Sequence, residues 1–328
     1  MKKIAHFIAH SGVASIVASL LLLCAYWGAS CGFDLSGESL ADVADEVGWM
    51  RWLTPLGCFL MAYLAVKPTV EFSLATTRMP LVGTLFLMGC CIAPLSVCEP
   101  THLALLALLS AACYLMLGTY RNRLAMGDYF VAFVLVGLAT FVVPRLLWAA
   151  PLFVLCCYPL HSLHFRTFAA ALLGLLTPYW VAFCLLYLTD NMPMIPAFAD
   201  ALSLAPPRYA VASEPVADVI IRYLPLVWVL LILLPGSISI LSDSTLKLRS
   251  HSCYNYFMLL VCVLLVVVAL VPSLYAPLLP LLLLLVAYIG IPLFGDQMSR
   301  AGNIYLLVLT LLWAALLTLP LWMPFIPF

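Results

Sequence analysis

Acidic side chains gather in one stretch near the start of the chain. Residues 31–50 carry five carboxylates, and Asp34, Asp45 and Glu46 are among them. Such carboxylates either take a proton from an acceptor hydroxyl as a general base or bind a divalent cation through oxygen. These three are therefore the candidate catalytic residues, and a divalent metal is implied only if they act on a substrate.

The same stretch predicts an amphipathic helix lying on the outer membrane surface. Its acidic residues occupy faces other than the apolar one, whose residues recur at helical spacing and are Leu40, Val43, Val47 and Met50. A solvated acidic face above an interfacial anchor explains this pattern without any chemistry. Both interpretations of 31–50, the plain surface helix and the carboxylate site, stay open.

Arginine is suited to binding phosphate, because its planar guanidinium donates two parallel hydrogen bonds. Arg145, Arg208 and Arg222 are the candidate lipid-phosphate-binding residues. Arg208 lies in 190–217, where the four prolines before Ser213 oppose a long helix. This segment is either a structured lid over a site or a plain connector.

Histidine and cysteine do not outline a metal site. His161 and His164 stand three apart without a third ligand nearby, so they are interpreted as a surface pair. Most of the 12 cysteines fall in apolar stretches, where cysteine packs as a small apolar residue. Cys31 and Cys98 could form a disulfide in an oxidising compartment if their helices are neighbours. No cofactor is expected unless the carboxylates are catalytic.

Composition places these residues in a membrane protein. Hydrophobic residues make up 66% of the 328 residues and charged residues 9%, against roughly 45–50% and 25% in soluble domains. A water-soluble core cannot bury that much apolar surface. The net charge is zero and there is no long basic cluster, which argues against a nucleic-acid partner. No fingerprint of a soluble enzyme, such as GxSxG or a P-loop, is present.

Eleven apolar stretches are candidates to cross the bilayer, because about 20 residues of helix span its hydrocarbon layer. They must be helices, since an unpaired backbone amide in lipid is costly. The predicted spans are 12–30, 51–66, 80–97, 102–119, 128–143, 146–160, 167–189, 219–241, 254–272, 274–294 and 303–325. The first span has an alternative interpretation as a cleaved signal peptide.

Charges sort by side when the loops are assigned alternately to the two faces of the membrane. Ten of the 14 Lys and Arg residues share a side with the N-terminus, and ten of the 14 Asp and Glu residues lie on the other. The basic side is cytoplasmic by the positive-inside rule. We therefore expect the N-terminus inside, the C-terminus outside, and 31–50 and 190–217 as the two large outer loops.

Some spans allow more than one interpretation. Segments 128–143 and 146–160 are short and meet at a proline, so they form either a tight hairpin of two spans or a re-entrant pair. Thr177-Pro178 and Pro235-Gly236-Ser237 interrupt the seventh and eighth spans. Such breaks mark unwound sites in some transporters but are more often kinks that hydroxyls and neighbouring helices repair. No charged residue lies near the centre of a predicted span, which disfavours an ion-coupled transporter.

A stripe of small residues follows one face of the first span. Ser11, Ser15 and Ser19 recur every four residues, with alanines beside them. Small residues let helix backbones approach closely in lipid. We expect this stripe to pack against another helix, either of this chain or of a membrane-protein partner.

Several short motifs, some apolar and some at the edges of loops, occur in 77–190 and 298–312. They are Thr77-Arg78-Met79-Pro80-Leu81, Gly127-Asp128-Tyr129-Phe130, Val136-Gly137-Leu138-Ala139, Phe165-Arg166-Thr167-Phe168, Leu173-Gly174-Leu175-Leu176-Thr177-Pro178-Tyr179 and Arg300-Ala301-Gly302-Asn303-Ile304. These motifs resemble those of a family of uncharacterised multi-spanning inner-membrane proteins of Bacteroidetes. The resemblance implies an envelope protein of the inner membrane and brings no catalytic residues.

The layout of the chain also resembles that of type C glycosyltransferases. One span leads from the inside to an acidic outer loop with a surface helix, here 31–50, and a second large outer loop follows later, here 190–217. The resemblance implies an enzyme with a polyprenyl-phosphate-linked donor on the periplasmic side. A carboxylate base would face the acceptor, and an arginine would bind the donor phosphate.

The sequence thus predicts an all-α polytopic helix bundle of about 11 transmembrane helices, a single transmembrane domain over 1–328 in the bacterial inner membrane. The leading functional hypothesis is a non-catalytic component or scaffold of the cell envelope. A type C glycosyltransferase-like enzyme and a transporter are the alternatives. The expected partners are membrane lipid, a polyprenyl-phosphate lipid under the enzyme hypothesis, and another membrane protein, without nucleic acid.

Overall fold

The computed structural model is mainly helical, and none of the described residues forms a strand. It describes residues 16–22, 24, 50–75, 80–93, 97, 99–122, 124–189, 198, 202, 216–242, 246–294 and 300–322. For 50–53, 216–222, 294, 300–303 and 319–322 it describes the backbone alone.

Several of the described helices have the composition of membrane spans. Five are long and apolar enough to cross a membrane, at Pro100–Gly118, Phe165–Leu188, Tyr223–Ser242, Leu248–Leu270 and Pro272–Leu293. Shorter apolar helices occur at Leu81–Ile92, Met126–Val142, Ala150–Leu160 and Ile304–Thr318. The predicted all-α class and membrane character are confirmed. The number of spans and the side on which each terminus lies stay predictions.

The chain divides into two compact units, each assembled from separate parts of the sequence. Unit 1 comprises Met1–Leu103, Tyr209–Leu246 and Leu282–Phe328, and unit 2 comprises Ala104–Arg208 and Lys247–Leu281. Helices α8 (Pro100–Gly118) and α15 (Tyr275–Ile289) each contribute residues to both units. The single domain expected over 1–328 stays a prediction.

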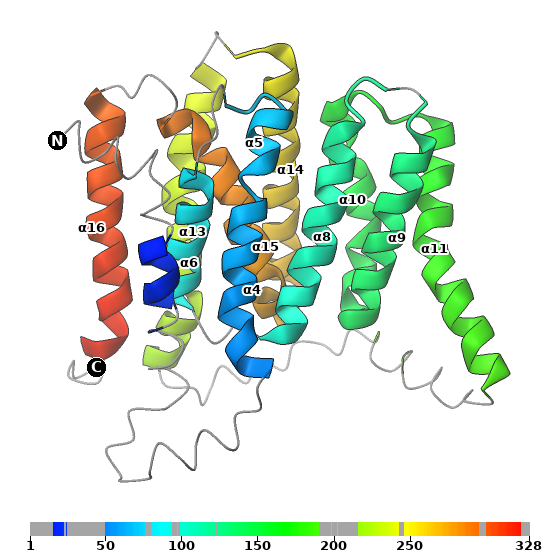
Figure 1. Ribbon diagram of the computed structural model, residues 1–328, viewed down its shortest axis with the longest axis horizontal. Coiled ribbons are helices and arrows are strands. Elements are labelled where there is room, and N and C mark those ends of the chain that lie inside the picture. Colours follow the sequence, from blue (N-terminus) through cyan, green and yellow to red (C-terminus); the bar gives the residue numbers. More distant parts are fainter. Residues whose placement is uncertain are drawn as a thin grey trace. The chain divides into compact units, whose positions relative to one another are not determined.

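Unit 1 is built around α6 (Leu81–Ile92), whose residues are all buried. Helix α6 contacts three other helices of this unit (Figure 1), namely α4 (Met50–Leu64), α13 (Val216–Ser242) and α16 (Arg300–Trp322). The short segments α5 (Lys67–Glu71) and η5 (Ile291–Phe294) contact α4 and α13 respectively. A helix that is apolar on all sides is stable only when it is covered on all sides, by protein or by lipid, and here protein covers α6.

Residues 16–22 of the first predicted span belong to unit 1. Ala18 and Leu22 are buried, and the Cys91 thiol of α6 lies 3.6 Å from the Ala18 carbonyl oxygen. The Ser19 hydroxyl donates to the Ile16 carbonyl of its own helix, at 2.7 Å. This face of the first span therefore packs within the chain near Ala18. Ser11 and Ser15 lie outside the described residues, so a partner at their positions stays a prediction.

Helix α13 continues through Pro235 without a break. Proline has no N–H, so it leaves the carbonyl of Leu231, four residues earlier, without its helical donor. The Tyr305 hydroxyl of α16 donates to that carbonyl. A neighbouring helix thus repairs the interruption, as expected for a tolerated kink, and the unwound site that the transporter hypothesis needs is not formed at Pro235.

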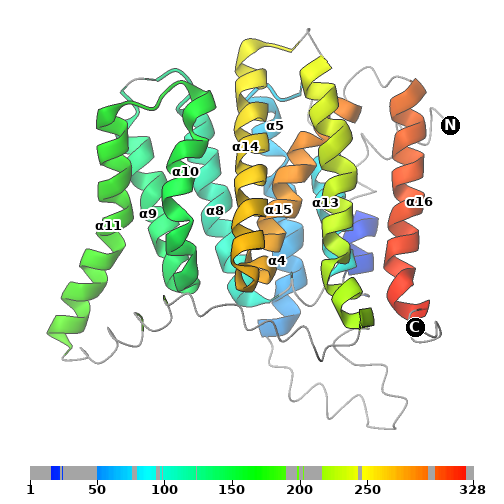
Figure 2. The ribbon, with the colours of Figure 1, turned by 180° about the vertical axis from the view of Figure 1, so that it is seen from behind.

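Unit 2 consists mainly of helices that run alongside one another in both views (Figures 1 and 2). Besides most of α8 and the start of α15, its segments are α9 (Met126–Val142), η1 (Pro144–Trp148), α10 (Ala150–Cys156), η2 (Tyr158–Leu160), α11 (Phe165–Leu188), α14 (Leu248–Leu270) and η4 (Pro272–Leu274). Helix α14 packs against α10 and η2, and α11 packs against α9.

The expected span 146–160 is a series of short helical segments rather than one helix. The segments η1, α10 and η2 each have a proline at the first or second position, namely Pro144, Pro151 and Pro159. Proline starts a helix well but cannot continue one, which explains the interruptions. The Arg121 amide donates to the Leu160 carbonyl at 3.0 Å, so the series returns to the end of α8.

Residues 128–160 therefore form a hairpin, and how deeply it enters a membrane stays a prediction. The hairpin also gives unit 2 two distinct ends. We call the end that holds η1 the η1 end, and the opposite end, which holds η2, the η2 end. Helix α9 runs from the η2 end to the η1 end, and its 17 residues correspond to about 25 Å.

Helices α9 and α11 approach each other backbone to backbone. A Cβ atom at Gly137 of α9 would lie 2.9 Å from the Leu175 carbonyl oxygen and 2.9 Å from the Pro178 ring of α11. A Cβ atom at Gly174 of α11 would overlap the Phe130 carbonyl oxygen of α9. The two glycines allow this approach because they carry no side chain, and they hold α11 in one position against α9.

Candidate functional site

Arg145 is the only one of the six candidate site residues whose side chain the structure describes. Arg222 belongs to α13, where the backbone alone is described. The other four lie outside the described residues and are Asp34, Asp45, Glu46 and Arg208. Their roles, and any approach between the acidic loop and the arginines, stay predictions.

Arg145 is the second residue of η1, at the η1 end of unit 2. The residue before a proline avoids the helical conformation, and Val143, with φ −132° and ψ 92°, is extended. Helix α9 therefore ends at Val142, and the chain turns sharply into η1. The turn leaves the Arg145 side chain half-buried beside the end of an apolar helix.

The η1 end also receives part of the large loop 190–217. The Trp148 indole, at the end of η1, donates from Nε1 to the Leu202 carbonyl oxygen at 3.1 Å. A hydrogen bond from a side chain of one segment to the backbone of another fixes where that backbone lies. Leu202 is thus held at the η1 end, close in the chain to Arg145.

A cluster of three aromatic rings joins α9, α11 and the same loop. Phe141 lies 4.9 Å from Tyr179 and 5.7 Å from Phe198, and Tyr179 lies 6.0 Å from Phe198, measured between ring centroids. The Tyr179 hydroxyl also shares a hydrogen bond with the Thr140 hydroxyl. Ring pairs at these separations stabilise their contact beyond the area that they bury. Two described points of 190–217, Phe198 and Leu202, therefore both contact the η1 end.

Among the described residues of unit 2, the η1 end holds the positive charge of Arg145 and no carboxylate. Asp128 is the one acidic residue that the structure describes in unit 2, and it lies in the first turn of α9, at the η2 end. No described carboxylate forms an ion pair with Arg145. A half-buried guanidinium favours an anionic partner, because partial burial costs it hydration.

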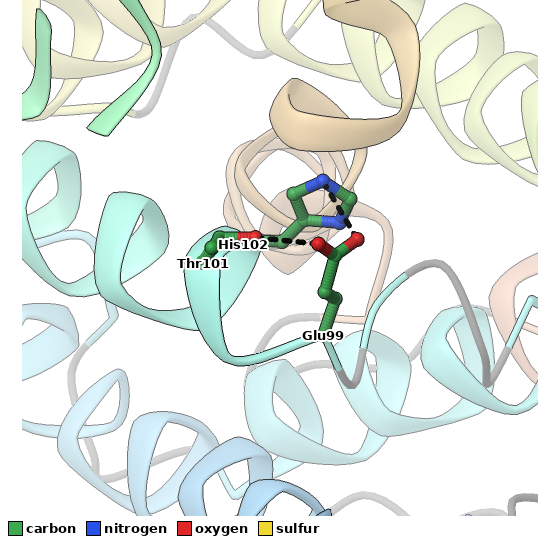
Figure 3. Close-up of polar contacts among 3 residues, drawn as sticks. All are labelled: Glu99, Thr101 and His102. Atoms are coloured by element: carbon green, nitrogen blue, oxygen red, sulfur yellow. Dashed lines mark hydrogen bonds and ion pairs between the residues drawn. The ribbon is translucent and has the colours of Figure 1, made fainter. Parts of the chain in front are cut away.

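A second polar arrangement lies at the start of α8, in unit 1 (Figure 3). The Glu99 carboxylate accepts a hydrogen bond from the Thr101 hydroxyl at 2.8 Å, and its other oxygen lies 3.3 Å from His102 Nε2. His102 is buried, whereas Glu99 is exposed. Negative charge is favourable at the N-terminus of a helix, where the dipole is positive. We interpret the arrangement as a cap that stabilises the first turn of α8.

Buried hydroxyl groups meet at the η2 end. The Ser162 hydroxyl lies 2.8 Å from that of Tyr129 and 3.1 Å from that of Thr119, and the Thr119 hydroxyl also donates to the Met116 carbonyl at 2.7 Å. These hydrogen bonds offset the cost of burying the groups. The cluster joins the end of α8, the start of α9 and the segment before α11, which is a structural role.

Sulfur groups pack beside these hydroxyls. The Cys157 thiol and the Tyr256 hydroxyl each lie 3.4 Å from the Met116 sulfur, and all three residues are buried. Cys113 and Cys156 are buried in the same unit. Neutral sulfur groups in such surroundings fill space and form weak hydrogen bonds. These cysteines pack as the sequence predicted.

His161 and His164 are both exposed, on either side of the turn that leads into α11. The His164 amide donates to the Thr167 hydroxyl at 2.7 Å, which fixes the start of α11. Across the parts of the chain that are described, no three His, Cys, Asp or Glu side chains gather as metal ligands do. The interpretation of the two histidines as a surface pair needs no revision.

Fold and composition together define a helical membrane protein. Comparison with known protein families, with curated proteins and with solved structures finds no match. The resemblances to a Bacteroidetes inner-membrane family and to type C glycosyltransferases therefore stay predictions.

Two arrangements in the structure were not predicted from the sequence. The sequence could have predicted the Glu99 cap, because an acidic residue directly before Pro100 at the edge of an apolar stretch is typical of a helix start. The contact of Phe198 with Phe141 and Tyr179 had none, since the three residues are far apart in the chain. Only the fold brings them together.

Proposed function

We propose that this protein is a non-catalytic component of the bacterial inner membrane that holds other membrane proteins of the cell envelope. The observation that supports this proposal is the arrangement of α11. Its 24 residues extend for about 36 Å, longer than the hydrocarbon layer. One face packs on α9, and most of the other side chains are exposed.

Two properties make α11 suitable as a binding surface. The backbone contacts at Gly137 and Gly174 hold it rigidly, so an incoming helix meets a surface that is already ordered. The exposed face is also rich in large aromatic side chains, which dominate protein interfaces; they are Phe165, Phe168, Trp180, Phe183 and Tyr187.

Photo-crosslinking in intact cells tests this proposal, because it distinguishes a protein neighbour from lipid. A photoreactive amino acid is placed at Leu173 of α11, whose side chain is 61% exposed, or at Val266 of α14, which is 57% exposed in the same unit. We expect discrete protein adducts from position 173 and none from position 266. Lipid adducts alone at both positions, or the same protein adducts at both, would show that α11 is an ordinary lipid-facing helix.

A transferase that uses a phosphate-linked lipid is the second candidate function. The observation that favours it is that Arg145 and two described residues of 190–217 lie at one end of unit 2. In this hypothesis Asp34, Asp45 or Glu46 would supply the base, and a divalent metal would assist. The test is release of sugar from a polyprenyl-phosphate donor by the purified protein, with Asp34→Asn expected to abolish release without unfolding the chain. Unchanged release in Asp34→Asn, Asp45→Asn and Glu46→Gln would reject this assignment of the base.

A further inference from the structure

The η1 end of unit 2 combines a cation with the surroundings of a membrane boundary. Trp and Tyr are typical of the headgroup region, where one part of the side chain is apolar and the other is hydrated. Trp148 is 57% exposed, yet its indole N–H is bonded to Leu202. Tyr179 likewise has its hydroxyl bonded to Thr140 and its ring against Phe141. Arg145 lies in η1, between Phe141 and Trp148 in the sequence and directly after an apolar helix.

Apolar side chains are exposed on the end of α9 and in η1. Leu138, Phe141 and Val142 are exposed on the last two turns of α9, and Trp148 is exposed in η1. A hydrocarbon chain beside these residues would place its polar end at the level of η1. The charge and the apolar surface are therefore arranged as the head and the tail of a lipid are.

We propose that Arg145 binds the phosphate group of a membrane lipid whose hydrocarbon chain lies along the exposed face of α9. The guanidinium donates two hydrogen bonds to the phosphate oxygens and neutralises their charge. Phe198 and Leu202 lie at the same end of unit 2, where they contact Phe141 and Trp148. The site binds without any covalent step.

This inference names the ligand class for the second candidate function and deepens it, but it requires neither turnover nor a protein partner on α11. The shared chemistry is a phosphate attached to a lipid chain. Two sources carry it in a bacterial membrane, a phosphodiester such as phosphatidylglycerol and a polyprenyl phosphate monoester. Loop carboxylates at Asp190 and Asp200 are the competing partners for Arg145, and both lie outside the described residues.

Native mass spectrometry of the full-length protein tests the site. Wild type, Arg145→Gln and Arg166→Gln are each titrated in detergent with phosphatidylglycerol, with a polyprenyl phosphate and with inorganic phosphate. Arg166 is the matched control, because it is an exposed arginine of the same unit at the start of α11, near the η2 end. Thermal unfolding of each variant establishes that it is folded.

We expect Arg145→Gln to weaken binding of one phosphate lipid by about tenfold or more and Arg166→Gln to leave it unchanged. Arg145→Lys should restore part of the affinity, since lysine keeps the charge without the bidentate geometry. A preference between the two lipids identifies the source, and inorganic phosphate should bind weakly because it lacks the chain.

Equal lipid affinity in wild type and Arg145→Gln would overturn the proposal. A second result would also overturn it: Arg145→Gln and either Asp190→Asn or Asp200→Asn lose the same stability, and none of these variants changes lipid binding. The arginine would then be part of an internal ion pair. Lipid binding by Arg145 with no sugar release would leave the binding site established and the transferase function rejected. The two proposals therefore fail separately.

Discussion

Replacing Gly174 by alanine should loosen the contact between α9 and α11. The new Cβ would overlap the Phe130 carbonyl oxygen, with the Phe130 carbonyl carbon 3.1 Å away. These are backbone atoms of a helix and cannot rotate aside, so the cost lies toward the upper part of the roughly 1–3 kcal/mol typical of overpacking. Alanine regains about 1 kcal/mol of helix propensity over glycine. The expected net loss is roughly 1–2 kcal/mol.

The matched control is Gly127→Ala, which makes the same chemical change in α9, where a Cβ atom meets nothing within 4 Å. This variant should be neutral or slightly more stable. A thiol-reactive fluorescent dye reports the unfolding of unit 2 in a background where Cys156 and Cys157 are the only cysteines kept, since these two are buried and react only once the unit opens. Equal melting temperatures for Gly174→Ala and Gly127→Ala would refute the close backbone packing of α9 and α11.

Three further substitutions test other contacts. Tyr305→Phe should lower the stability of unit 1 by about 1 kcal/mol in thermal unfolding. The loss should be smaller in a Pro235→Ala background, where the residue 235 amide can again donate to the Leu231 carbonyl. An unchanged loss would contradict the repair of the kink by Tyr305. Ser162→Ala should cost about 1–3 kcal/mol in the thiol assay, because it removes the hydroxyl that lies 2.8 Å from the buried Tyr129 hydroxyl, whereas Thr119 keeps its bond to the Met116 carbonyl. Wild-type stability would reject that cluster. Glu99→Gln should weaken the cap of α8 by about 0.3–1 kcal/mol, seen as faster amide exchange near His102; unaltered exchange there would show that the charge does not stabilise this turn.

The sequence predicted the helices of this protein well because membrane helices are recognised by length and composition. Helices α8, α11 and α13 each overlap closely with a predicted span. The prediction was least accurate at 146–160, where three prolines divide the helix. Apolar length alone indicated a span there, but proline geometry determines where each short segment begins.

The candidate site was predicted only in part. Arg145 was identified by residue type, and its half-buried position at the η1 end agrees with a phosphate-binding role that stays a proposal. Its neighbourhood could not be predicted, because Trp148 meets Leu202, and Phe141 meets Phe198, across more than 50 residues of chain. Neither pairing follows a local spacing that a sequence pattern can reveal.

What the sequence by itself determined is the class, an all-α membrane protein, because apolar composition and the need to satisfy backbone hydrogen bonds in lipid act on each segment separately. The tertiary structure alone decided which helices touch and which prolines are tolerated. Tyr305 repairs α13 at Pro235, and Gly174 brings α11 onto α9. Such contacts depend on shape matching between distant segments, and in a chain this uniformly apolar many pairings have the same hydrophobicity but only a few have the right shape.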